Sequence, residues 1–162
     1  MRVIVMGVAG CGKSTVGAAV AEQLNATYSD GDDLHPATNI AKMSAGTPLN
    51  DDDRAPWLDL VGTRLREADA SILVGCSALK RIYRDRITQA AGGPVTFLHL
   101  HGARAVIEER MAARTGHFMP VALLDSQFAT LEPLQDDELS VIVDIDQSFD
   151  AVVAQSVRGL PS

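Results

Sequence analysis

Short apolar runs alternate with longer amphipathic segments along the chain. Runs with the character of buried strands occupy residues 2–6, 26–29, 71–76, 95–101 and 140–145. Between the first two runs, apolar side chains recur at helical spacing, which predicts an amphipathic helix over residues 13–24. Such alternation is typical of βαβ units, so we predict an α/β fold in which helices cover a parallel sheet.

Four further helices follow from the same spacing. Three of them are predicted at about residues 79–91, 103–114 and 148–158. The fourth carries Trp57 on its buried face, with Asp52 and Asp53 as expected capping residues and Pro56 in its first turn. No repeat, low-complexity tract or linker divides the chain, so we predict a single domain over residues 1–162.

Two stretches interrupt the alternation. Residues 30–70 separate the second strand from the third, and residues 115–139 separate the fifth helix from the last strand. Connections within compact domains have a median length of about 4–6 residues. Because longer insertions usually carry function, we expect both stretches to contribute to a site.

Composition and charge narrow the function classes. The 162 residues are 46% apolar and include 14 basic and 21 acidic side chains, which gives a net charge of −7. This composition fits a packed globular domain and excludes disordered and fibrous chains. An acidic chain without a basic run is a poor nucleic-acid binder. We therefore expect no nucleic-acid partner, and any anionic ligand must meet locally concentrated positive charge.

We expect neither a membrane-spanning segment nor a signal peptide in this sequence. No apolar run approaches the roughly 18–20 residues of a membrane span, and residues 1–6 lack the apolar core of a signal peptide. Cys11 and Cys76 are expected to be reduced, because a domain with an adequate core does not need a single disulfide. We therefore expect a cytoplasmic protein with no membrane partner.

A phosphate-binding pattern lies between the first strand and the first helix. The segment Gly7-Val8-Ala9-Gly10-Cys11-Gly12-Lys13-Ser14 matches G-x-x-x-x-G-K-[ST] in the context that this P-loop motif requires. Its glycines let backbone N–H groups face phosphate, Lys13 neutralises the β and γ oxygens, and Ser14 can bind Mg²⁺. The residues expected to hold the nucleotide are Gly7, Gly10, Cys11, Gly12, Lys13, Ser14 and Thr15. The alternative is a glycine-rich turn that binds nothing.

Other motifs argue against two classes of P-loop protein. A GTPase needs an N-K-x-D guanine motif, which the sequence lacks, and its D-x-x-G match at residues 59–62 falls within a predicted helix. The third strand runs into Cys76 and Ser77 rather than into the acidic residue that ends a Walker B strand. A motor-type or AAA-type ATPase is therefore disfavoured.

Two carboxylates follow the second predicted strand. Asp30 and Asp32 come where ligands bind in open α/β sheets, at the carboxyl end of a strand near the P-loop. Phosphoryl transfer needs one carboxylate near Mg²⁺ and another that can accept a hydroxyl proton, and this pair can supply both. The alternative is an Asx-turn that caps a helix.

Five ordered blocks of the sequence together resemble the gluconokinase family. They are the P-loop; Asp30-Gly31-Asp32 followed by His35; residues 39–43 with residues 46–58; Cys76-Ser77-Ala78-Leu79-Lys80 with Tyr83-Arg84-Asp85; and Gly116-His117-Phe118-Met119. The resemblance covers nearly the whole chain, and its wider circle includes shikimate kinase and the adenylate-kinase-like fold. It implies a three-layer P-loop fold with strand order 2-3-1-4-5, a substrate-binding insertion at about 30–70 and a lid at about 115–125.

The resemblance also implies roles for three residues. Asp30 resembles the carboxylate that holds Mg²⁺ through water in shikimate kinase, and Asp32 resembles the one that contacts the reacting hydroxyl. Arg54 lies where these relatives place an arginine for the substrate carboxylate, and a planar guanidinium suits bidentate recognition of such a group. The alternative for Arg54 is an ion pair with an aspartate at residues 51–53.

Further basic and polar residues are weaker candidates. Those that could bind the hydroxyls or carboxylate of the substrate are His35, Lys42, Ser77, Lys80 and Arg84. Lys80 and Arg84 are four residues apart and are expected to share a helix face, where they could equally form a surface charge cluster.

Two arginines precede the 116–119 motif. Arg110 and Arg114 lie one helical turn apart on the helix that leads into it. Lid arginines that close over phosphates stabilise the transferring charge. We therefore expect both to be catalytic, and Arg110 also to contact the nucleotide. The alternative is an ordinary exposed helix surface.

These features together predict an ATP- and Mg²⁺-dependent kinase that converts D-gluconate to 6-phospho-D-gluconate, with Lys13 and Asp32 at the reacting groups. One alternative is a kinase of another small hydroxy acid, such as shikimate. Another is a non-catalytic P-loop nucleotide sensor. The resemblance further implies a homodimer.

Overall fold

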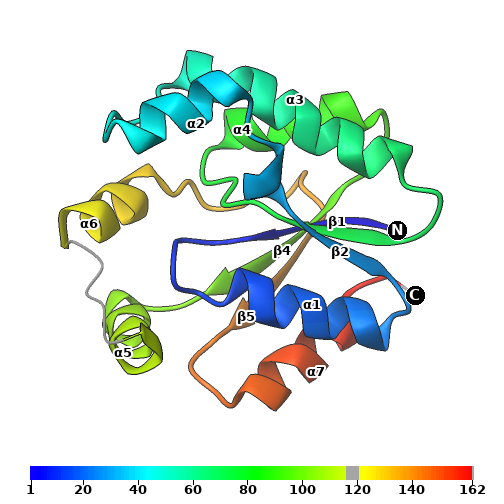
Figure 1. The fold of residues 1–162 in the computed structure, drawn as a ribbon. Helices are drawn as coiled ribbons and strands as arrows, with labels where there is room; N and C mark the ends of the chain where they lie inside the picture. The colour runs from blue at the N-terminus through cyan, green and yellow to red at the C-terminus, as the bar shows by residue number, and fades with distance from the viewer. Residues whose placement is uncertain (116–120, 162) are drawn as a thin grey trace.

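The computed structural model describes residues 1–115 and 121–161, which are built around one parallel sheet (Figure 1). Its strands are β1 (Arg2–Met6), β2 (Thr27–Asp30), β3 (Ile72–Gly75), β4 (Thr96–His101) and β5 (Ser140–Asp144). They pair in the order β2-β3-β1-β4-β5, and all four pairings are parallel. The predicted fold class and strand order are confirmed, and each strand end lies within one residue of its predicted position.

Helices cover both faces of this sheet. Helices α1 (Lys13–Gln23) and α7 (Phe149–Gly159) lie on one face, and α3 (Asp51–Glu67) and α4 (Arg81–Ala91) pack together on the other (Figure 1). Helix α5 (Arg104–Thr115) follows β4. These are the five helices that the apolar spacing predicts. Among the described residues, none of the helices is long and apolar enough to cross a membrane.

The two long stretches contain elements that the spacing did not specify. The first holds the 3-10 helix η1 (Gly31–Leu34) and α2 (Ala37–Ser44) before α3 begins. The second holds α6 (Val121–Thr130), which lies at the same end of the sheet as α5 (Figure 1). Residues 116–120 fall outside the described part of the chain, so the lid at about 115–125 stays a prediction.

The central strand β1 is buried on both faces, which explains its continuous apolar run. Val3 and Val5 belong to the core shared with α1 and α7, whereas Ile4 and Met6 belong to the core shared with α3 and α4. Because alternate side chains of a strand point to opposite faces, a strand covered on both sides needs apolar residues throughout.

The start of α3 differs from its prediction. Asn50 is the N-cap: its side chain accepts a hydrogen bond from Asp53 N at 2.8 Å, and the Asp53 carboxylate accepts one from Asn50 N at 3.0 Å. Asp53 therefore closes a capping box from the third helical position, while Asp52 lies inside the first turn and does not cap. Pro56 consequently lies in the second turn rather than the first.

Candidate active site

A cavity of about 270 Å³ lies where the P-loop meets the carboxyl ends of β2 and β3. Its lining residues are Ala9, Lys13, Ser14, Tyr28, Asp30, Asp32, Gly75, Cys76, Ser77 and Gln127. Five of the predicted site residues are among them, and they come from three separate segments of the sequence. The parallel sheet explains this meeting, because the carboxyl ends of its strands share one edge.

The P-loop backbone adopts positive φ angles at its glycines. Gly7, Gly10 and Gly12 adopt positive φ angles of 149°, 84° and 96°, a region that residues with a Cβ rarely adopt. At Gly7 a Cβ would also lie 2.6 Å from Cys11 Sγ and 2.8 Å from Leu100 O. The N-terminus of α1 has no side-chain cap and no acidic residue in its first turn, so its N–H groups are available to an anion.

Lys13 lies against its own loop. Its Nζ donates to Gly7 O at 3.1 Å and to Val8 O at 3.2 Å. In the described part of the chain, no carboxylate forms an ion pair with it. The ammonium group of Lys13 therefore borders the cavity without a close carboxylate partner in that part of the chain.

The two aspartates after β2 differ in their surroundings. Asp30 Oδ1 accepts a hydrogen bond from Asp32 N at 2.9 Å and caps η1. One carboxylate oxygen of Asp30 therefore makes the capping contact that the Asx-turn alternative predicted. Asp32 reaches toward solvent, yet desolvation by the surrounding protein raises the pKa of its carboxyl, and the charge of Asp30 adds to this effect. A raised pKa strengthens Asp32 as a proton acceptor.

His35 is held by an aromatic stack beside these aspartates. Its ring stacks on Trp57 with a centroid separation of 4.1 Å, and its Nδ1 lies 3.3 Å from Asn39 Nδ2. Because the same Asn39 nitrogen donates to Asp53 O at 3.0 Å, it is the amide donor, and His35 Nδ1 is the acceptor. Burial lowers the pKa of His35, so the ring is neutral at pH 7 and carries its proton on Nε2, 3.9 Å from Asp32 Oδ1.

Three predicted basic residues lie outside the cavity lining and contact the acidic start of α3. Lys42 Nζ lies 2.6 Å from Asp53 Oδ2, and Lys80 Nζ lies 3.2 Å from Asp51 Oδ2. Arg54 Nη1 donates to the carbonyl oxygen of residue 49 at 2.7 Å and lies 3.9 Å from Asp51 Oδ1. The contact between Arg54 and Asp51 agrees with the ion-pair alternative for Arg54. The contact between Lys80 and Asp51 agrees with the surface-cluster alternative for Lys80.

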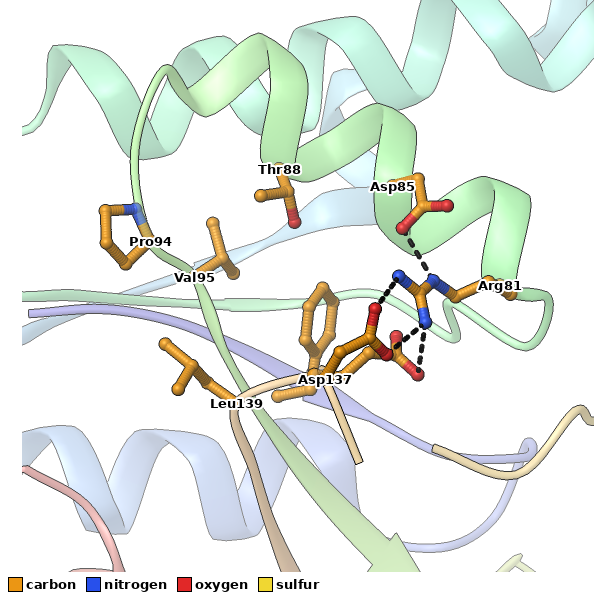
Figure 2. Close-up of a pocket in the computed structure, with 9 residues that line it drawn as sticks. Arg81, Asp85, Thr88, Pro94, Val95, Asp137 and Leu139 are labelled. Carbon is orange, nitrogen blue, oxygen red and sulfur yellow. Dashed lines mark hydrogen bonds and ion pairs between the residues drawn. The ribbon is translucent and has the colours of Figure 1, made fainter. Parts of the chain in front are cut away.

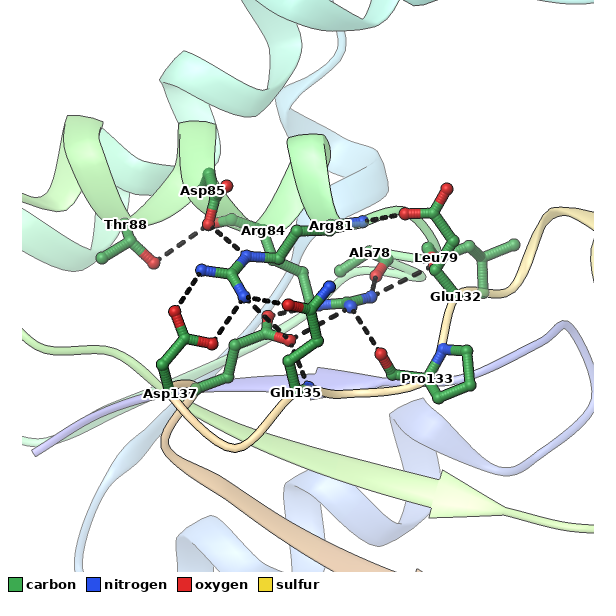
Figure 3. Close-up of polar contacts among 11 residues, drawn as sticks. Ala78, Leu79, Arg81, Arg84, Asp85, Thr88, Glu132, Pro133, Gln135 and Asp137 are labelled. Atoms are coloured by element: carbon green, nitrogen blue, oxygen red, sulfur yellow. Dashed lines mark hydrogen bonds and ion pairs between the residues drawn. The ribbon is translucent and has the colours of Figure 1, made fainter.

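Arg84 fits neither of its two interpretations, substrate binding and a surface charge cluster. Its side chain is 0% exposed, so the surface-cluster alternative is wrong for this residue. Its Nε donates to Glu138 Oε1 at 2.7 Å, and its other nitrogens donate to Glu138 Oε2 and to the carbonyl oxygens of Ala78, Leu79 and Pro133 (Figure 3). A ligand could bind only by replacing these contacts, so the assignment of Arg84 to the substrate is corrected to a structural role.

Lys80 and Arg84 also do not share a helix face. Lys80 is the N-cap residue that precedes α4 rather than a residue within the helix. Its side chain runs to Asp51, whereas that of Arg84 turns into the protein toward Glu138. The helical spacing rule fails here because it applies only between residues with helical backbone angles.

A separate cavity of about 230 Å³ lies under α4 (Figure 2), and its lining includes no residue of the P-loop. Its charged residues are paired with one another: Arg81 Nε lies 2.7 Å from Asp85 Oδ1, and Arg81 Nη1 lies 2.7 Å from Asp137 Oδ1. Arg81 Nη1 also lies 3.8 Å from Glu138 Oε2. These pairs leave little unpartnered charge for a ligand.

Arg110 lies beside the P-loop but does not line the cavity that contains Lys13. With Gly10, Cys11, Gly12 and Thr15 it lines a cavity of about 190 Å³. Its Nη2 donates to the carbonyl oxygens of Ile145 and Gln147. The side chain of Arg114 and the 116–119 motif lie outside the described residues, so their predicted roles stay predictions.

Sequence reasoning missed several cavity residues. Tyr28 precedes Asp30 by two positions on β2, so strand alternation alone could have placed both on one face. Gln127 has no such signal, because it comes from α6 and no motif surrounds it. Cys76 follows β3 in the cavity wall, and burial raises the pKa of its thiol to about 12, so it is not an activated nucleophile.

Comparison with known proteins gives the family. A family model described as "AAA domain" matches residues 3–134. The chain belongs to this family, and relatives that align over most of their length give a narrower assignment. The thermoresistant gluconokinase of Escherichia coli (strain K12) is 46% identical over 160 residues, which cover 96% of this chain and 90% of that protein. The chain belongs to the gluconokinase family.

Solved structures agree with this family. A gluconokinase from Sinorhizobium meliloti 1021 is 48% identical and superposes with a TM-score of 0.87, covering 98% of this chain and 90% of that one. Shikimate kinase from Aquifex aeolicus superposes with a TM-score of 0.61 at 16% identity, with coverage of 96% and 92%. The second likeness shows a shared fold alone. The resemblance of the sequence to the gluconokinase family is therefore confirmed.

Proposed function

We propose that the protein transfers the γ-phosphoryl group of ATP to D-gluconate and forms 6-phospho-D-gluconate. The observation that carries this proposal is the cavity that the P-loop residues Lys13 and Ser14 line together with Asp30 and Asp32. One wall of the cavity offers an ammonium group and the open N-terminus of α1 to phosphates. Asp30 and Asp32, in the same lining, offer carboxylates to an acceptor hydroxyl. Membership of the gluconokinase family supports gluconate as that acceptor.

Two of the cavity residues fit a Mg²⁺ ion. The hydroxyl of Ser14 and the carboxylate of Asp30 line the same cavity, and hard oxygen atoms of these kinds are the protein ligands that Mg²⁺ takes. When bound, the ion neutralises charge on the phosphate oxygens. We propose Ser14 and Asp30 as the residues that hold it.

The protein's own groups act by positioning and charge. Asp32 orients the terminal hydroxyl of the substrate for in-line attack and accepts its proton, which its raised pKa favours. Lys13 stabilises charge on the transferring phosphoryl group. His35, fixed by Trp57 and Asn39, presents Nε2–H on the Asp32 side. We propose that His35 and Ser77 bind substrate hydroxyls.

Arg54 is the proposed anchor for the substrate carboxylate. Its only carboxylate contact among the described residues is the long one to Asp51, at 3.9 Å. A substrate carboxylate that binds both guanidinium arms would make shorter and better-aligned hydrogen bonds. Lys42 and Lys80 lie on the same acidic helix start and are proposed to contribute positive charge to this end of the site.

The proposal also includes a lid, a dimeric state and a location in the cytoplasm. Residues 115–125 are proposed to close over the phosphates and bring Arg114 to them, with Arg110 at the P-loop cavity. The single folded unit is proposed to act as a homodimer in the cytoplasm, where the two free and buried cysteines would stay reduced. Light scattering of the purified protein tests the dimer.

The decisive experiment is a coupled assay of ADP release with a panel of hydroxy acids. Gluconate should give the highest kcat/KM, and the product should carry its phosphate on the terminal hydroxyl. Preferential turnover of shikimate would transfer the assignment to another small-acid kinase. ATP binding with no acceptor-stimulated ADP release would identify a nucleotide sensor instead.

A further inference from the structure

Gln127 connects a distant helix to the P-loop. It lies on α6, 118 residues from Ala9, yet its Oε1 accepts a hydrogen bond from Ala9 N at 2.6 Å. It also lines the cavity that contains Lys13, Ser14 and Asp32. No other residue of α6 lines this cavity among those that the structure describes.

The hydrogen bond fixes which way the amide of Gln127 points. Ala9 N can only donate, so the atom that meets it is the oxygen. The Nε2 group is therefore the other arm of the amide, and within the described ranges 1–115 and 121–161 nothing accepts a hydrogen bond from it. Gln127 thus brings an uncharged N–H donor, without an acceptor among the described residues, to the wall of a cavity with two carboxylates.

The base of α6 is firmly attached, so the position of Gln127 is well defined. Leu124 is buried in the core beneath the P-loop, and Leu131 packs against both core clusters. Directly after α6, Glu132 N donates to Leu79 O at 2.8 Å, and Glu132 Oε1 accepts from Arg81 N at 2.8 Å. A donor held by a packed helix loses little entropy when it binds a ligand.

We propose that Gln127 recognises the terminal phosphate of the bound nucleoside triphosphate. Its Oε1 keeps the Ala9 N–H of the P-loop in place, and its Nε2 donates to a γ-phosphate oxygen. A neutral donor suits this position, because it adds a hydrogen bond to an anionic group without forming an ion pair with Asp30 or Asp32. The inference rests on the proposed function only in that the P-loop binds a nucleoside triphosphate, and it does not depend on the identity of the acceptor.

Two substitutions separate the two arms of the amide. Gln127→Glu keeps the length of the side chain and an oxygen for Ala9 N, but it replaces the Nε2 donor with an anionic oxygen. Gln127→Leu removes both arms without adding charge. Gln89→Glu, on the exposed surface of α4, makes the same change of charge away from the cavity and serves as the matched control.

The readout is calorimetric binding of ADP and of a non-hydrolysable ATP analogue, each with Mg²⁺. Gln127→Glu should weaken binding of the ATP analogue at least about tenfold, the value of a lost hydrogen bond to a charged group, and change ADP binding by less than about twofold. Gln127→Leu should show the same selectivity with a smaller loss. Gln89→Glu should bind both nucleotides as the wild type does.

Two results would overturn the inference. One is an equal loss of affinity for ADP and the ATP analogue in both Gln127 variants, which would indicate a structural role. The other is unchanged affinity for the ATP analogue in Gln127→Glu. Failure of the proposed function gives a different pattern, because a wild-type protein that does not phosphorylate gluconate can still show the selective loss. Circular dichroism of each variant separates lost recognition from lost folding.

Discussion

The P-loop cavity and the Arg84 network both hold charged residues, but their charges are satisfied in different ways. Arg84 is fully buried and donates to Glu138 and to three backbone carbonyl oxygens. Among the described residues, Lys13 donates only to carbonyl oxygens of its own loop. A buried charge without a partner is costly, so a fully paired arginine indicates a structural role. A lysine at a cavity wall with no ion pair in the described part of the chain indicates a binding role.

The carboxylates of the two regions show the same contrast. In Glu138, burial acts to raise the pKa, but hydrogen bonds from Arg84 and from the backbone of Gln135 outweigh it and leave the pKa below its usual value. In Asp32 the pKa is raised by desolvation and by the charge of Asp30. Glu138 is thus stabilised as an anion, while Asp32 is adapted to take up a proton.

The variant with the largest expected effect is Lys13→Ala, which tests the binding role of Lys13. The variant should lose phosphoryl transfer by about 10³- to 10⁵-fold, because it removes a charge that stabilises the transition state. Its unfolding temperature should stay close to that of the wild type, since no packed apolar group is removed. Steady-state kinetics and thermal unfolding measure the two effects. Near-normal turnover in the folded variant contradicts the P-loop assignment.

Asp32→Asn tests the reactive carboxylate. It should lower kcat about 10²- to 10⁴-fold, the usual contribution of a general base, with a smaller effect on KM because the proton moves in the transition state. Asp33→Asn, an exposed neighbour outside the cavity, is the matched control and should retain activity. Equal losses in both variants would assign the effect to the local fold.

Glu138→Leu tests the opposite region. The buried guanidinium of Arg84 would lose its partner, so the free energy of unfolding should fall by about 3–5 kcal/mol. The double variant Arg84→Leu/Glu138→Leu should recover part of this loss, since no unpaired charge remains. Urea unfolding measures both. A loss below about 1 kcal/mol, the value of an exposed ion pair, is incompatible with the structural role.

Arg54→Lys tests the carboxylate anchor. Lysine keeps the charge but loses the two-armed geometry, so KM for gluconate should rise about tenfold, the value of one hydrogen bond to a charged group, while kcat changes less. Arg66→Lys, exposed on the same helix, should leave KM unchanged. Glucose, which lacks the carboxylate, should be a very poor substrate of the wild type. Equal kcat/KM values for glucose and gluconate would refute the anchor.

The smallest expected effect is the acid sensitivity contributed by Glu138. Its pKa is lower in the folded than in the unfolded chain, so its stabilisation is complete above the unfolded value near ~4.3 and is lost as the pH falls through the lower folded value. Between pH 7 and pH 3, the unfolding free energy of the wild type should therefore fall more than that of Glu138→Gln. Parallel curves would show that Glu138 contributes nothing to acid unfolding.

The sequence predicts the fold more completely than it predicts the site. Buried parallel strands must be apolar on both faces, so the pattern at residues 2–6 predicts β1 directly. The P-loop is also local in sequence. In contrast, Gln127 reaches the cavity from 118 residues away, and the sequence near Arg84 shows its charge but not its partner, Glu138. Long-range pairing of this kind is set by packing, which no local pattern contains.

The buried ion pair also bears on how the chain folds. Arg84 and Glu138 are 54 residues apart, and the guanidinium lies beneath α4. A partly folded intermediate in which α4 has docked on the sheet before residues 131–139 arrive would hold an unpaired arginine in its interior. Such intermediates are disfavoured by several kcal/mol. We therefore expect residues 131–139 to fold in the same cooperative transition as the N-terminal strands.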